Sequence, residues 1–133
     1  MRTRYTVVLS MLAGAALGAI SVGGLYAQGK TPGAYAVIVF TDLGDQAAFK
    51  TNVLDKAVPT IPKHGGTRIV ATQEFTLLRE GTPPFPLKRY VLIGFDNVQQ
   101  AKAWYGSGDM KDVNAYIEQH TKGRAYVVEA LKQ

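Results

Sequence analysis

The chain has 133 residues, the length of one domain, and its 47% hydrophobic and 19% charged residues are typical of a folded rather than a disordered protein. Its net charge of +5 comes from scattered Lys and Arg side chains, without a basic stripe or a nucleic-acid-binding motif, so nucleic acid is not an expected partner. The absence of cysteine excludes disulfides, thiolate nucleophiles and thiolate-bound metal clusters.

Residues 1–27 have the pattern of a signal peptide: Arg2 and Arg4, a long apolar stretch, and small residues leading to Ala27. We therefore expect cleavage near Ala27 and a periplasmic or secreted protein. The alternative is an uncleaved inner-membrane anchor, because the apolar stretch is long enough to cross about 30 Å of hydrocarbon. No other membrane association is expected. A short polar linker, 28–33, then leads to one globular domain, 34–133.

The globular domain begins with a strand predicted over 34–41, whose residues are apolar on both alternating faces. A helix is expected next, capped by Asp42 or Asp45. It ends before the turn at 64–66, which reads His-Gly-Gly. Residues 67–78 are then predicted to form a long second strand, with the interspersed polar residues typical of a sheet edge.

Residues 79–86 contain three prolines and are predicted to form a stiff loop. The third strand, expected over 87–95, is again apolar on both faces and runs directly into a helix start. Asp96 is the expected N-cap of that helix, and Gln99 is placed to complete a capping box.

Two more elements complete the chain. A last helix is predicted over 110–120, and a closing strand over 124–130. The resulting β-α-β-β-α-β order predicts an α+β fold, the ferredoxin-like plait. Helices cover only one face of such a sheet, yet two strands are apolar on both faces. We therefore predict a homodimer whose sheets pack face to face, a dimeric α/β barrel. The alternative is a monomer whose own loop and terminus cover that face.

Several short motifs occur together between 34 and 131. They are the aromatic and aliphatic first strand, Phe49, Gly65-Gly66, Glu80-Gly81, Arg89, Phe95 and Ala103-Trp104-Tyr105-x-Ser107. With them the chain resembles a small bacterial family, domain of unknown function 1330. The resemblance implies a ferredoxin-like dimeric α/β barrel, with exported members among its relatives, and implies no established activity.

Three positions depart from that family. Gly94, Met110 and Ile117 stand where relatives often have an acidic residue, a tyrosine and an arginine. If these positions line a pocket in relatives, the resemblance implies that the pocket of this protein is more apolar and lacks these polar groups for proton transfer.

The catalytic candidates are His64, Arg89 and Tyr105. A histidine pKa suits acid–base work, although His64 can equally be an exposed turn residue. Arg89 shares a strand face with apolar neighbours expected to be buried, so its guanidinium needs an acceptor from Glu80 or from a ligand carboxylate.

Trp104 and Tyr105 lie at the end of a helix, where they either wall an apolar pocket or belong to the ordinary core. The expected ligand-binding residues are therefore Glu80, Arg89, Trp104 and Tyr105. No metal-ligand spacing and no cofactor motif is found, so neither a metal nor a cofactor is expected.

The leading functional hypothesis is the binding of a small apolar or aromatic molecule in a cleft between helices and sheet. One alternative is a cofactor-independent oxygenase or isomerase, which relies on fold analogy. Another is a periplasmic interaction protein without a small ligand.

Overall fold

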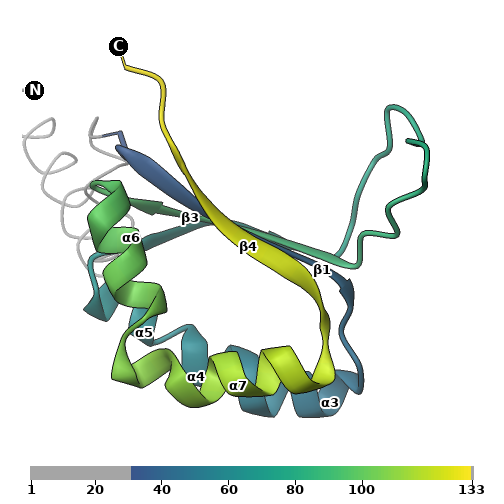
Figure 1. The fold of residues 1–133 in the computed structure, drawn as a ribbon, viewed down its shortest axis with the longest axis horizontal. Coiled ribbons are helices and arrows are strands. Elements are labelled where there is room, and N and C mark those ends of the chain that lie inside the picture. The colour runs from purple at the N-terminus through teal and green to yellow at the C-terminus, as the bar shows by residue number, and fades with distance from the viewer. Residues whose placement is uncertain (1–30, 133) are drawn as a thin grey trace, which may run out of the picture. The chain divides into compact units, whose positions relative to one another are not determined.

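The computed structural model describes residues 31–132; the predicted signal peptide and the first half of the linker, 28–30, lie outside this range. Four strands form one antiparallel sheet in the order β2-β3-β1-β4 (Figure 1). Their bounds are β1 Ala34–Asp42, β2 Thr67–Thr72, β3 Arg89–Phe95 and β4 Lys122–Glu129. This is the predicted ferredoxin-like α+β fold, with both central strands apolar on each face.

The first connection is a helix in several segments. Asp45 is its N-cap, because a side-chain oxygen accepts a hydrogen bond from the Ala48 amide at 2.8 Å. The segments that follow are α3 Gln46–Phe49, the π-helical turn η1 Lys50–Leu54, α4 Asp55–Ala57 and α5 Thr60–Lys63. The helical stretch ends at Gly65, whose φ of 84° is readily adopted only by glycine.

The second connection contains α6 Val98–Tyr105, the 3-10 turn η2 Gly108–Met110 and α7 Lys111–His120. The predicted cap of α6 is wrong by one residue. Asn97 is the N-cap and accepts from the Gln100 amide at 2.8 Å, while the Gln100 side chain accepts from the Asp96 amide at 2.9 Å. The pair of polar side chains that closes the helix start is therefore Asn97 and Gln100, rather than Asp96 and Gln99.

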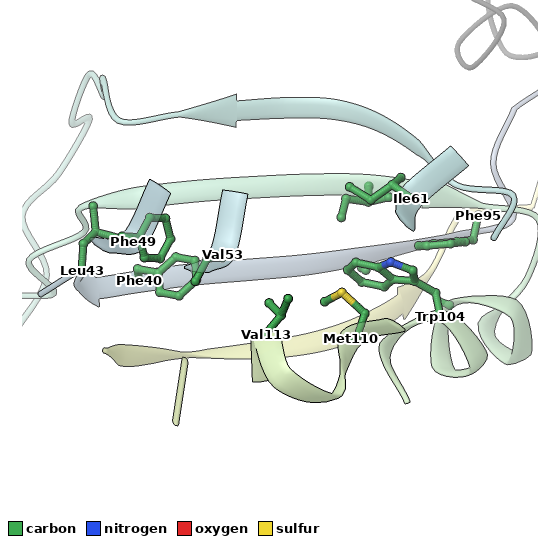
Figure 2. Close-up of a cluster of buried hydrophobic side chains, with 12 residues drawn as sticks. Phe40, Leu43, Phe49, Val53, Ile61, Phe95, Trp104, Met110 and Val113 are labelled. Atoms are coloured by element: carbon green, nitrogen blue, oxygen red, sulfur yellow. The ribbon is translucent and has the colours of Figure 1, made fainter. Parts of the chain in front are cut away.

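All described helices lie on one side of the sheet (Figure 1). Alternate residues of β1 and β3 face them, and the core forms where they meet (Figure 2). Its fully buried members include Ile93, Phe95, Trp104 and Val113. Phe40 and Phe49 pack edge to face at 5.2 Å toward one end of this core, and Phe95 and Trp104 lie 5.5 Å apart toward the other.

The second strand is shorter than predicted, since β2 ends at Thr72 rather than at Leu78. The reason lies in its partner: Thr72 pairs with Tyr90, and the residues before β3 include three prolines, which have no backbone N–H for a ladder. Residues 73–88 form instead an arm that projects from the sheet (Figure 1), where Leu78 is 98% exposed.

Within the described residues, no helix has the length and apolar character needed to cross a membrane.

Candidate functional site: a cavity between helices and sheet

A cavity of about 450 Å³ lies between the helices and the sheet. Most of its wall is apolar and comes from both layers: Ile38, Phe40, Val91 and Ile93 from the sheet, and Phe49, Val53, Ile61, Trp104, Met110, Val113 and Ile117 from the helices. Its volume is within the range of about 300–1,000 Å³ that is typical of small-molecule sites. The cavity is therefore large enough to hold a small organic molecule.

Small residues leave this space open. Ala57 on α4 and Ala125 on β4 face it with a single methyl group each, and Gly123 lies opposite Phe40 in the sheet. A Cβ atom at Gly123 would overlap the carbonyl oxygen of Val39, so the backbone approach at this point requires glycine.

Trp104 is held rigidly in the wall. Its indole Nε1–H donates to the Thr60 hydroxyl at 2.8 Å, and that hydroxyl donates to the carbonyl oxygen of Ala57 at 2.6 Å. Both side chains are buried. The hydrogen bond satisfies the one polar atom of the indole and ties α6 to α5, so one face of the cavity has a fixed shape.

Arg89 contributes the most unusual polar group of the cavity. The residue is only 9% exposed, as expected from the strand face on which it lies. Its Nε is buried without a hydrogen-bond partner, and no ion pair or hydrogen bond to its side chain is formed within residues 31–132. Burial lowers the pKa of the guanidinium, and the neighbouring positive charge of Arg68 lowers it further. A buried cation of this kind is a strong hydrogen-bond donor in need of an acceptor.

Tyr105 is a second polar group in the cavity wall. Its ring lies 5.9 Å from that of Trp104, and it is partly exposed. Burial raises the pKa of its hydroxyl, and the Glu118 carboxylate raises it further, so the hydroxyl stays protonated and can donate or accept a hydrogen bond.

The structure does not bring all predicted site residues to this cavity. His64 is not among the lining residues; its Nε2 lies 3.1 Å from Asp109 Oδ2, which Lys63 also contacts at 2.8 Å. These two hydrogen bonds lower the pKa of the Asp109 carboxyl. His64 thus links the end of α5 to η2, and this contact has a structural role.

Glu80 lies in the exposed arm and does not line the cavity. Within the part of the chain that the structure describes, no ion pair joins it to Arg89. Of the four predicted ligand-binding residues, the cavity therefore contains Arg89, Trp104 and Tyr105.

Two of the positions that depart from the family pattern lie in the cavity wall. Met110 and Ile117 are lining residues, whereas Gly94 faces the other side of the sheet, toward Pro32 and Ile69. An arginine at 117 or a tyrosine at 110 would make the cavity more polar than it is here.

Arg68 and Glu118 also line the cavity and were not predicted. Arg68 pairs with Ile93, whereas Val70 pairs with Leu92. A register shift between Arg68 and Val70 therefore puts these two side chains on opposite faces of the sheet. Simple alternation places Arg68 and Val70 on the same face, and the sequence carries no signal for the shift. Glu118 is exposed and follows Ile117, a partly buried residue of α7, so helical spacing alone does not predict that it lines a cavity.

The fold and this cavity define a small ferredoxin-like domain with an apolar cavity beneath its sheet. Residues 33–131 match the family model described as a domain of unknown function (DUF1330), and the chain belongs to that family. No match was found among curated proteins. A similar solved structure is the crystal structure of a protein of unknown function from Rhodopseudomonas palustris, a structural genomics target. It is 10% identical, with a TM-score of 0.56 over 86% of this chain and 95% of that chain, a likeness of fold.

Proposed function

We propose that this protein binds a small apolar or aromatic molecule in the cavity between helices and sheet. The observation that carries the proposal is the cavity itself, about 450 Å³ in volume, with apolar walls and a few polar groups. Arg89 and Tyr105 provide the polar contacts, and Trp104 provides a rigid aromatic surface. Binding buries apolar surface of the ligand without rearranging a core that is already formed.

Trp104 offers a direct test, because it is the only tryptophan of the chain and lies in the cavity wall. The neutral apolar dye N-phenyl-1-naphthylamine should bind the protein that begins near Gln28, quench the tryptophan fluorescence and raise the Tm. Replacing Val53 with phenylalanine fills part of the cavity from η1, so we expect Val53→Phe to fold and to weaken dye binding by about tenfold or more.

The matched control is Val98→Phe, which makes the same change at a half-buried position of α6 that is neither in the cavity lining nor on the sheet, and it should leave dye binding unchanged. If Val53→Phe and the parent protein bound the dye with equal affinity, the dye would bind outside the cavity. Absence of any quenching and of any Tm shift would overturn the proposal.

In the alternative function, a cofactor-independent oxygenase or isomerase, His64 would be the general acid or base. Because that side chain contacts Asp109 outside the cavity, we do not include catalysis in the proposal.

We also propose that the protein is exported, on the strength of the leader pattern in residues 1–27. A mature N-terminus at or near Gln28 supports cleavage, and an intact N-terminus in the membrane fraction supports the anchored alternative.

The proposal includes a homodimer formed by the sheet face opposite the helices. Several large apolar side chains are exposed on that face: Ile69 at 44%, Tyr126 at 48% and Val128 at 42%. A second copy presents the same apolar face and is therefore a chemically suitable cover for it.

A further inference from the structure

The charged residues that line the cavity are mostly basic: Arg68, Arg89, Lys122 and Arg124, against the one acidic residue Glu118. Arg89 lies on β3 opposite Phe40, at the end of the core where Phe40 and Phe49 pack together. Arg68, on β2, adds a second positive charge to the same lining. We propose that the ligand is an organic acid with an apolar body, whose carboxylate accepts hydrogen bonds from the Arg89 guanidinium. This inference rests on the proposed function and specifies the chemical class of the ligand.

The first argument is the cost of burying Arg89. An arginine that is nine-tenths buried is normally paired, because an unpaired buried charge is strongly disfavoured. Here its Nε has no hydrogen-bond partner, and the neighbouring Arg68 carries the same charge. A carboxylate matches the fork of guanidinium N–H groups and would supply the missing acceptors with the opposite charge.

The second argument is that the acids closest to this site do not pair with Arg89. Glu118 is the acidic residue of the cavity lining, and within residues 31–132 no ion pair joins it to Arg89. Asp55 borders a smaller hollow next to Arg89, but both of its oxygens accept from Lys50 Nζ, at 3.1 and 3.2 Å. Neither carboxylate neutralises the guanidinium.

The third argument concerns access and the shape of the ligand. Arg89 borders both the main cavity and the smaller hollow of about 260 Å³, which Leu43 and Gln73 also line. Inside the main cavity its neighbours are apolar, among them Phe40, Phe49 and Val91. A ligand with one anionic end and an aryl or short acyl body therefore fits both the charge and the walls.

The test compares acids with neutral amides of the same shape. Calorimetric titrations would use two pairs, 2-naphthoic acid with 2-naphthamide and octanoic acid with octanamide, on the parent protein, Arg89→Met and Arg79→Met. Hydrogen bonds to a charged group contribute about 1.5–3 kcal/mol, so the parent protein should bind at least one acid about 10- to 100-fold more tightly than its amide. Arg89→Met should abolish this preference and leave amide binding within about threefold. Arg79→Met, which changes an exposed arginine of the arm, should behave as the parent protein.

Stability without ligand separates a binding role from a structural one. If Arg89 is retained for a ligand, the ligand-free Arg89→Met variant should have a Tm equal to or above that of the parent protein, because it loses an unpaired buried charge. If it were the partner of an internal acid, the variant would be destabilised. Arg89→Lys is the companion variant: it keeps the charge but loses the planar fork, and should bind acids with intermediate affinity.

The outcomes distinguish this inference from the proposed function. If the neutral dye binds but acids and amides bind equally well, the cavity is a binding site and the assignment of an acid is wrong. If neither the dye nor any member of the two pairs binds, the proposed function and the inference both fail. Should Arg89→Met not fold, the parent protein's preference for acid over amide and its reduction in Arg89→Lys decide the question.

Discussion

Trp104 is positioned by a single buried hydrogen bond. Its Nε1 donates to the Thr60 hydroxyl across a sequence separation of 44 residues, and both groups are shielded from water. When a buried N–H loses its acceptor, the protein is destabilised by the full desolvation free energy of that N–H group. This free energy is larger than the net contribution of the hydrogen bond to stability. The wall of the cavity therefore depends on a hydroxyl at position 60.

We expect Thr60→Val to lower the free energy of unfolding by about 1–3 kcal/mol, because valine has nearly the same shape but cannot accept the indole N–H. Urea denaturation followed by the fluorescence of Trp104 measures the change. Thr60→Ser keeps the hydroxyl and should lie closer to the parent protein. Equal stability of Thr60→Val and Thr60→Ser would show that the hydrogen bond does not matter.

At the scale of elements, the start of α6 shows why a cap is hard to assign from sequence. Asp96 and Asn97 are adjacent and are both good cap residues, and each has a glutamine three positions later. The pattern alone does not choose between them. The choice follows from β3, whose pairing with β1 extends to Phe95 and keeps the next residue out of the helix.

We expect Asn97→Ala to lower the free energy of unfolding by about 1 kcal/mol, since the Gln100 amide loses its acceptor at the helix N-terminus. Asn97→Ser retains a capping oxygen and should cost much less. Chemical denaturation of both variants gives the comparison. A loss of stability in Asn97→Ser as large as in Asn97→Ala would mean that the side-chain cap is not the cause.

At the scale of the whole molecule, the two faces of the sheet differ in what covers them. The helices bury one face, whereas Ile69, Tyr126 and Val128 on the other are partly exposed. Large apolar side chains exposed on one face of a sheet are typical of interaction surfaces. The proposed homodimer would bury them and leave the cavity on the helix side of each subunit.

We expect the parent protein to have twice the mass of one chain in sedimentation equilibrium at micromolar concentration. Val128→Arg should shift it to the monomer, because the interface would then contain a buried charge. Ala103→Arg, on the exposed surface of α6, is the control and should remain a dimer. A monomeric parent protein, or a Val128→Arg variant that is still a dimer, would contradict the proposed interface.

Much of the fold was predictable because it depends on local patterns. The order of strands and helices, the apolar character of β1 and β3 on both faces, and the burial of Arg89 all follow from the alternation of side chains along a strand. The end of β2 was not predictable in this way, since it depends on prolines in the segment that would have paired with it.

The sequence by itself determined the ferredoxin-like topology and the family, and it made Arg89, Trp104 and Tyr105 candidate ligand-binding residues. Only the tertiary structure decided that Arg68 and Glu118 also line the cavity, whereas His64 and Glu80 do not. It also decided that a cavity of about 450 Å³ remains between the helices and the sheet. The physical reason is that periodicity sets which way a side chain points, whereas a register shift, a neighbouring acid and unfilled volume arise only when separate elements pack together.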